Sequence, residues 1–502
     1  MSEQSAVLAT LIAYKAVLLG IGVWAARRTG DADDFFVGGR GVGGFVSGLS
    51  YAASTSSAWV LLGFSGFIYT GGVSALWMLP GIWGGYAVMW LVVAPRLAAS
   101  AKAGRLVTLT DYLTQGMTPG GARAVAWVST ALVLVCFVAY IAAQFDAAAL
   151  AFTDQFGMST LEAVLLGAAV ILAYALMGGF WAVSVTDALQ GVVMALAATA
   201  LPVAAVIAAG GPGGVAAALE GAPTGYLSPT GGRAAWAFLG FALGIASIGL
   251  GTFGQPHLHA RLMGLRDEAA RRRGFALSMG WAVVVYLGMA ALALAGRAMT
   301  GGDLADGEAL FYRTASDVLP PVLAGVVIAA ILSAVMSTVD SVLLAAAGAV
   351  AHDLGHTRRH PARALLISRA VMAGIAGLAV ILTLSLPDTI FNRVLFAWSA
   401  LGAAFGPLVF ARIAGRRPGT APTLAAILSG FCVCVLFYGL GAGRGGGVLG
   451  DLARLEGDAF ERVFPWVIPS TILAFSGPAR PGTAGTRSRS RPPSRSRPRP
   501  PA

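Results

Sequence analysis

Two hydroxyl residues, Ser337 and Thr338, stand side by side within a long apolar run, in the segment LSAVMSTVD. Hydroxyl oxygens and backbone carbonyls can replace the water around a hard cation without placing a full charge in an apolar environment. A hydroxyl residue can also bend or loosen a helix by bonding to the preceding turn. Both residues are therefore candidate cation ligands, and the alternative is that their hydroxyls are satisfied within their own helix.

Two acidic residues lie in apolar runs, Asp187 in VSVTDALQ and Asp146 in QFDAAAL. An ionisable group in such a run is costly and is by default functional. For Asp187 the alternative is an acid stabilised by the macrodipole at a helix N-terminus. For Asp146 we consider an ion pair with Lys15, contact with a substrate amine, or a protonated acid without a functional role.

No motif predicts an enzyme. His352 and His356 stand four residues apart in AHDLGHTRRH, a spacing that can hold a metal on one helical face. No third ligand is nearby in the sequence, so we expect a solvated loop there. The Gly-rich loops lack the Lys-Ser/Thr of a phosphate-binding loop. We expect no catalytic residues, no organic cofactor and no metal other than the coupling cation discussed below.

The composition places these residues in a membrane protein. Of the 502 residues, 57% are hydrophobic and 11% are charged, whereas a soluble protein carries about 25% charged residues. Apolar stretches of about twenty residues, the length that crosses a bilayer, recur along the chain. The sequence predicts an all-α polytopic membrane protein whose solvent is the lipid bilayer.

Hydropathy defines about thirteen candidate spans in a transmembrane domain over residues 1–477. The spans are residues 6–26, 43–70, 74–95, 124–150, 160–178, 184–209, 233–254, 274–296, 320–349, 364–385, 389–411, 421–441 and 461–477. Most loop arginines and lysines follow odd-numbered spans. Because cytoplasmic loops are enriched in basic residues, we predict an outside N-terminus and a cytoplasmic C-terminus in the plasma membrane.

The net charge of +11 does not indicate a nucleic-acid partner. Much of the excess lies in loops and in residues 478–502, a Pro/Ser/Arg-rich stretch that we expect to be a disordered cytoplasmic tail.

Two spans contain residues that disfavour a plain helix. The second span includes the small and hydroxyl run GLSYAASTSSAW at residues 48–59, and the seventh combines several glycines with Pro256. Interrupted spans in corresponding positions of two halves point to the binding site of a transporter. The alternative is that the small residues only allow close helix packing.

Six ordered segments resemble the sodium:solute symporter family, and within it the sodium/proline symporters. They are DADDFFVGGRGVGGF, LSYAASTSSAWVLLG, TLTDYLT, GGFWAVSVTDALQ, GLGTFGQPHLHARLMG and LSAVMSTVDSVLL. The resemblance implies a LeuT-type fold with inverted repeats over residues 43–209 and 233–411. It also implies sodium as the coupling ion and thirteen spans.

The resemblance also implies roles for individual residues. The sodium ligands fall on the carbonyls of Ala53, Ser56 and Ala334 and on Ser337 and Thr338. Ser56 replaces a Met of the proline symporters, which should matter little for a backbone ligand. Asp187 matches an acidic position on the inner sodium path.

The implied substrate residues are Ser57, Trp59, Tyr140, Ile248, Thr252, Gln255 and Pro256. Ile248 and Thr252 replace aromatic residues of the proline symporters, which changes the volume and stacking of the pocket. The predicted function is sodium-coupled symport of a small solute, most simply an amino acid such as proline. The alternatives are another amino acid, a small organic acid, or a transporter-like membrane sensor. The sequence leaves the oligomeric state open.

Overall fold

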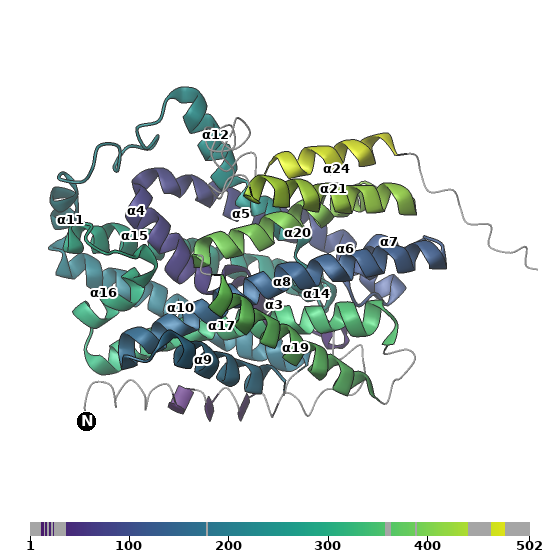
Figure 1. Cartoon of the computed structure of the whole chain (residues 1–502), viewed down its shortest axis with the longest axis horizontal. Helices are drawn as coiled ribbons and strands as arrows, with labels where there is room; N and C mark the ends of the chain where they lie inside the picture. Colours follow the sequence, from purple (N-terminus) through teal and green to yellow (C-terminus); the bar gives the residue numbers. More distant parts are fainter. Residues whose placement is uncertain are drawn as a thin grey trace, which may run out of the picture.

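The computed structural model describes parts of residues 12–24 and residues 37–176, 179–356, 363–386, 389–439 and 463–476 (Figure 1). Within these ranges the regular secondary structure is helical, apart from one isolated β-bridge between Val42 and Leu265. The fold class predicted from hydropathy is confirmed. The predicted tail at 478–502, most of the first span and Lys15 lie outside the described residues.

Nine stretches are long and apolar enough to cross a membrane among the described residues. The stretch from Gly44 to Gly104 contains both the second and the third predicted span, and the shorter apolar helices Thr160–Ala173 and Phe464–Phe475 match two others. The count of thirteen and the repeat boundaries remain predictions.

The helices of the first half, in chain order, are α3 (Gly44–Trp59), α4 (Ser65–Gly71), α5 (Met78–Val88), α6 (Ala94–Gly104), α7 (Leu109–Thr114), α8 (Pro119–Phe156), α9 (Thr160–Ala175), α10 (Phe180–Ala208) and α11 (Gly211–Leu219). Those of the second half are α12 (Ala235–Ala246), α13 (Ile248–Gly251), α14 (Pro256–Met263), α15 (Glu268–Thr300), α16 (Leu310–Val318), α17 (Pro321–Gly348), α19 (Ala364–Ser385), α20 (Ile390–Ile413), α21 (Thr420–Gly439) and α24 (Phe464–Phe475).

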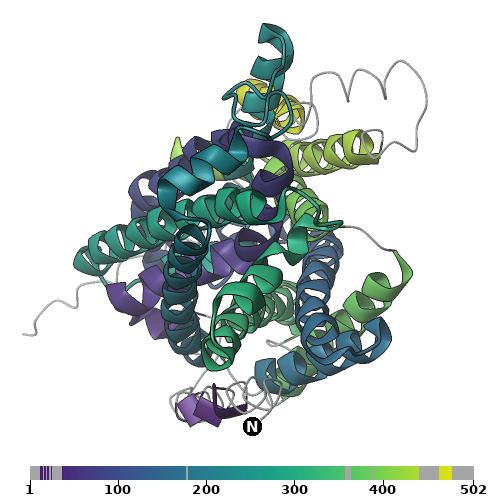
Figure 2. The same cartoon turned by 90° about the vertical axis from the view of Figure 1, so that its left-hand side faces the viewer.

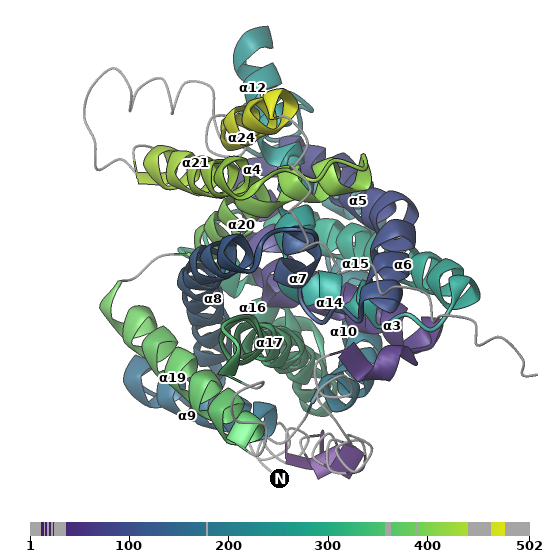
Figure 3. The same ribbon diagram turned by 90° about the vertical axis from the view of Figure 1, so that its right-hand side faces the viewer.

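Helices α3 and α17 form the buried centre, and α10 and α15 pack against α3 (Figure 2). Figure 3 shows α9 beside α19 on one side of this centre, with α21 and α24 at the opposite edge. Small residues permit the close central packing. A Cβ at Gly48 would lie 2.7 Å from the carbonyl oxygen of Gly274, so α3 and α15 approach backbone to backbone.

Both predicted interruptions are present. In the second span the break falls at Ser57, whose φ of 51° is left-handed for a non-glycine residue, and a π-helical turn, Val60–Phe64, follows. In the seventh span, α12 ends at Ala246, α13 ends at Gly251, and Gln255 is extended before Pro256 opens α14. Pro256 occupies the first helical turn, where its missing N–H has no cost.

Candidate functional site

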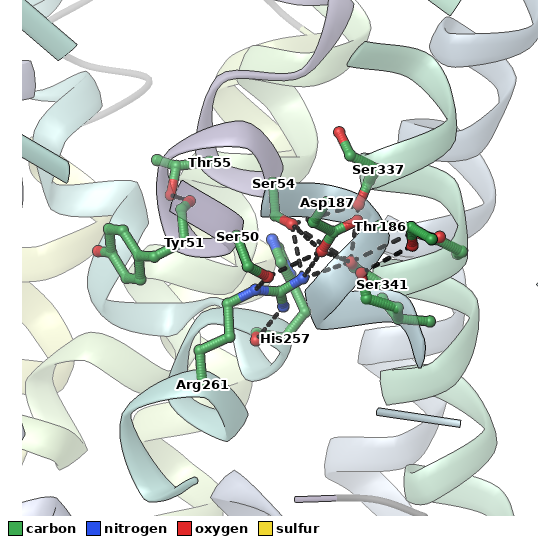
Figure 4. Close-up of polar contacts among 12 residues, drawn as sticks. Ser50, Tyr51, Ser54, Thr55, Thr186, Asp187, His257, Arg261, Ser337 and Ser341 are labelled. Carbon is green, nitrogen blue, oxygen red and sulfur yellow. Dashed lines mark hydrogen bonds and ion pairs between the residues drawn. The ribbon is translucent and has the colours of Figure 1, made fainter. Parts of the chain in front are cut away.

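A buried ion pair between Asp187 and Arg261 lies where α3, α10, α14 and α17 meet (Figure 4). Nη2 of Arg261 lies 2.6 Å from Oδ2 of Asp187, and the two side chains are 3% and 0% exposed. The same carboxylate oxygen accepts hydrogen bonds from Ser50 (2.9 Å) and Ser54 (3.2 Å) on α3. Asp187 is the eighth residue of α10, so it does not cap the N-terminus of that helix.

Arg261 connects all four helices. Its Nε donates to Ser50 at 2.8 Å, its Nη1 to the His257 carbonyl at 2.8 Å, and its Nη2 to Ser341 at 2.5 Å. The predicted spans at 233–254 and 274–296 place Arg261 in the loop between them, and that prediction is wrong because α14 continues the interrupted span into the core. The signal available was its position five residues after Pro256, inside a segment that carries the family resemblance.

Asp340 is a second buried acid in this cluster, and the sequence analysis missed it. The hydroxyl of Ser341 lies 3.3 Å from Asp187 and 3.4 Å from Asp340, so it bridges the two acids. Oδ1 of Asp187 and Oδ2 of Asp340 are buried and accept no hydrogen bond. Two carboxylates facing one guanidinium, with two unsatisfied oxygens, form an environment that favours a further cation.

The predicted sodium ligands lie on two helices that contact each other. Ala53 and Ser56 precede the break of α3, and the hydroxyl of Ser54 between them donates to the Ser337 carbonyl of α17 at 3.2 Å. The Ser337 hydroxyl donates to the carbonyl of Ala334 at 3.0 Å, so it is satisfied within its own helix. The Thr338 hydroxyl is buried and has no hydrogen-bond partner. Thr338 is thus the better placed of the two hydroxyls to bind an ion.

Five of the seven predicted substrate residues lie around the break in α3. Trp59, Ile248 and Thr252 line one cavity together with Trp398. Ser57 is the break itself, and the hydroxyl of Tyr140 lies close to Ser57 and Thr338. This arrangement brings the predicted substrate and sodium residues into adjacent positions.

Gln255 and Pro256 lie apart from that cavity. The amide of Gln255 donates to the Gly251 carbonyl at 3.2 Å, and its buried Oε1 has no partner. Pro256 instead lines a second cavity with His257, Arg261 and Ser341, which extends past Thr108 and Leu109 toward α7. Of the residues implied by the resemblance, Trp59, Ile248 and Thr252 therefore line the first cavity, Pro256 lines the second, and Gln255 lines neither.

Aromatic rings cover the first cavity at the end predicted to face outside. Trp59 stacks on Phe391 with ring centroids 5.7 Å apart, and Phe391 stacks on Phe67 at 4.6 Å. The carboxylate of Glu308 accepts hydrogen bonds from the backbone N–H groups of Ile390 (3.0 Å) and Phe391 (2.9 Å) at the start of α20. Burial raises the pKa of Glu308 to about 7, against the lowering effect of these two bonds.

Asp146 forms an ion pair at the same end of the molecule. Its partner is Arg393 of α20, which also donates to the Leu386 carbonyl. Of the alternatives for Asp146, the structure supports an ion pair, and the partner seen among the described residues is Arg393.

His352 does not lie in a solvated loop, contrary to our expectation. Its side chain is 13% exposed, and its Nε2 lies 2.9 Å from Oδ2 of Asp111 on α7. The residue belongs to a π-helical turn, Ala349–Asp353, that extends α17. Burial raises the pKa of Asp111, but the contact with His352 and the N–H groups of Val107 and Thr108 outweigh this effect and leave the pKa lowered.

Comparison with known proteins identifies the family. The family model "Sodium:solute symporter family" matches residues 35–430. The chain is 31% identical over 442 residues to sodium/proline symporter 2 of Staphylococcus saprophyticus, covering 85% of each chain. It is 31% identical over 455 residues to the sodium/proline symporter of Escherichia coli K12, covering 88% of this chain and 89% of that one.

Two solved structures share the fold. A Na⁺-coupled sialic acid symporter superposes with a TM-score of 0.75 at 17% identity, over 93% of this chain and 95% of that one. Mhp1, a nucleobase-cation-symport-1 family transporter, gives a TM-score of 0.54 at 11% identity, over 88% and 94%. The protein is therefore a multi-pass membrane transporter and not an enzyme, and it belongs to the sodium:solute symporter family.

Proposed function

We propose that this chain couples the inward flow of Na⁺ to the uptake of a small solute, and that the solute is an amino acid such as proline. The observation that carries the proposal is the unpartnered Thr338 hydroxyl on α17, opposite the α3 carbonyls that precede the break at Ser57. The names of the relatives, sodium/proline symporters, support the choice of ion and of solute class.

In this proposal Na⁺ binds the carbonyls of Ala53, Ser56 and Ala334 and the hydroxyls of Ser337 and Thr338. The Ser337 hydroxyl can contribute as well. It can donate its hydrogen to the Ala334 carbonyl and coordinate the ion through an oxygen lone pair at the same time. A bound ion would hold α3 against α17 and so fix the wall that carries Ser57 and Trp59. Ion binding and solute binding then favour each other.

The solute would occupy the cavity lined by Trp59, Ile248 and Thr252, next to Tyr140. The aromatic wall suits an apolar side chain. The N–H groups of Ala58 and Trp59 after the break, which here donate to Gln144 and to the Ser57 hydroxyl, would suit a carboxylate. Ile248 and Thr252 favour a second candidate, a solute of a different shape from proline, because they stand where the proline symporters carry aromatic residues.

The path to the cytoplasm would run along the second cavity. It leads from Arg261 and Ser341 past Pro256 toward α7, at the end that the arginine distribution predicts to be cytoplasmic. The rings of Trp59, Phe391 and Phe67 close the opposite end. The proposed state is therefore closed to the outside, with the exchange of Na⁺ and solute occurring from the inside.

The driving force is sufficient for uptake. A membrane potential of about 100 mV contributes about 2.3 kcal/mol per charge, and a tenfold sodium gradient adds about 1.4 kcal/mol. One Na⁺ per zwitterion therefore sustains about 500-fold accumulation.

The sodium site is tested by Thr338→Ala, with Ser337→Ala as the matched comparison. We expect Thr338→Ala to raise the sodium concentration for half-maximal uptake in proteoliposomes about tenfold or more, the loss of about 1.4 kcal/mol. Ser337→Ala should have the smaller effect because its hydroxyl already bonds Ala334. An unchanged sodium dependence in Thr338→Ala, at equal protein insertion, would remove the site from α17.

The solute site is tested by the double variant Ile248→Trp/Thr252→Tyr. Uptake of labelled proline relative to larger amino acids should rise in this variant, since two rings reduce the volume and restore stacking. If the unsubstituted protein already prefers proline strongly and the double variant loses it, our assignment of these two residues is wrong.

A further inference from the structure

A histidine and two aspartates converge between α7 and the end of α17, outside the proposed transport site. Nε2 of His352 and one carboxylate oxygen each of Asp111 and Asp353 all lie within 4.8 Å of one another. Asp111 is 241 residues from His352 along the chain. Asp353 directly follows His352 in the sequence, and the fold brings Asp111 to them.

The cluster contains two acids and one base, and one of its carboxylate oxygens has no hydrogen-bond partner. When both acids are ionised, even a protonated His352 leaves one net negative charge. Oδ2 of Asp353 is buried and accepts no hydrogen bond, a costly situation for a carboxylate oxygen. A cation coordinated by Oδ2 of Asp353 would remove the cost of burying this oxygen without a partner.

Neighbouring groups already orient the two carboxylates. The Thr108 hydroxyl donates to Oδ1 of Asp353 at 2.7 Å, which leaves Oδ2 directed toward the cluster. The N–H groups of Val107 (3.0 Å) and Thr108 (3.3 Å) donate to the Asp111 carboxylate. Outer contacts of this kind fix metal ligands and are part of a metal site.

The donor set and its exposure also fit a metal. One imidazole nitrogen and two carboxylate oxygens, with a position left for water, suit Zn²⁺. Ligand atoms about 2.0–2.1 Å from a tetrahedral Zn²⁺ are roughly 3.4 Å apart, so side-chain shifts of about 1 Å would complete the site. The side chains of His352 and Asp111 are 13% and 23% exposed, which provides an entry path.

We propose that Asp111, His352 and Asp353 form a binding site for a divalent transition metal, with Zn²⁺ as the ion that fits best. Binding would release any proton on Nε2 of His352 to solvent, since the metal needs that lone pair. The bound ion would join α7 to the end of α17. Thr108, Leu109 and Gly348 from the same two segments line the mouth of the second cavity, so the metal would restrain that mouth.

The test is isothermal titration of Zn²⁺ into the purified, tag-free protein in detergent. We expect one equivalent to bind, with affinity reduced at least tenfold in His352→Ala and in Asp353→Asn. His356→Ala is the matched control, because Nδ1 of His356 lies 3.2 Å from the Val350 carbonyl and outside the cluster. This control should bind Zn²⁺ like the unsubstituted protein.

A second measurement does not depend on the folding of any variant. Co²⁺ added to the unsubstituted protein should give the visible absorption of a low-coordinate site, and Zn²⁺ should remove it. The proposal is overturned if the unsubstituted protein binds no Zn²⁺, if His352→Ala binds it equally well, or if only His356→Ala loses it. None of these results would affect the proposed transport function, because no transport is measured.

Discussion

Two aspartate–arginine pairs join distant helices in the described part of the chain, and their surroundings differ. Asp187 and Arg261 are 0% and 3% exposed and share hydroxyl groups from α3 and α17. Asp146 and Arg393 are 24% and 6% exposed, and the second partner of Arg393 is a backbone carbonyl. The first pair is enclosed on all sides, whereas the carboxylate of the second remains partly in contact with solvent.

The difference in burial gives the two ion pairs different roles. A fully buried pair cannot lose one partner without leaving an unsolvated charge. A partly exposed pair can open, because water replaces the lost partner. The pair at Asp187 is therefore suited to hold four helices in one arrangement, and the pair at Asp146 is suited to an entrance that must open and close.

The largest effect should follow from Arg261→Gln. This variant leaves Asp187 charged and unpaired in the core, which should lower the free energy of unfolding by about 3–5 kcal/mol. Thermal unfolding in detergent measures the loss. Uptake should also be lost, because the α3 hydroxyls that Arg261 positions lie next to the proposed sodium ligands.

The double variant Asp187→Asn/Arg261→Gln is the control for this experiment. Without an unpaired charge, it should recover much of the thermal stability, although not the uptake. If the double variant is as unstable as Arg261→Gln, the cost arises from packing and not from charge.

A smaller loss of stability is expected from Arg393→Gln, which breaks the ion pair between Asp146 and Arg393 (the outer pair). The loss in unfolding free energy should be about 1–2 kcal/mol, because water reaches Asp146 when the guanidinium is removed. The same thermal unfolding assay measures it. A loss equal to that of Arg261→Gln would show that the two pairs do not differ as their exposure indicates.

The smallest effect is expected on the pH dependence of stability. It arises from Glu308, which lies next to the pair of Asp146 and Arg393. Burial holds the pKa of Glu308 near 7, above its ordinary value of 4.5, so ionisation is less favourable in the folded protein than in the unfolded one. The stability that this group contributes is present in full below about pH 4.5 and is lost as the pH rises through about 7.

Glu308→Gln should remove this dependence. Between pH 5.5 and 8.5, the melting temperature of the unsubstituted protein should fall by about 2 °C more than that of the variant. Equal slopes for the two proteins would mean that Glu308 does not titrate in this range. The comparison isolates one entrance group, since both proteins retain Asp146 and Arg393.

The sequence predicted well what depends on local composition. Hydropathy gave the all-helical membrane fold, and the small and hydroxyl residues at 48–59 located the interruption now seen at Ser57. A residue with positive φ and a single π-helical turn are determined by a few neighbouring residues, so a local pattern can predict them. The helix that carries Ala334, Ser337 and Thr338 contacts α3, and the sodium site proposed there stays a prediction.

The sequence did not predict contacts between distant residues. Hydropathy cannot distinguish the last turn of an interrupted span from a loop, so the predicted spans left Arg261 in the loop between residues 254 and 274. The ion pair of Asp146 among the described residues is with Arg393, 247 residues away. The environment of His352 likewise depends on Asp111. In each case the missing information is which helices become neighbours, and local pattern does not contain it.

The enclosed pair also imposes an order on the assembly of the chain in the membrane. Asp187 precedes Arg261 by 74 residues and Ser341 follows Arg261 by 80, so α10 leaves the ribosome before α14, and α17 after both. An arginine without a partner is costly in the bilayer core. Until α10 is in place, Arg261 should therefore stay with water and lipid headgroups, and α14 should enter the bundle only as a late step of biogenesis.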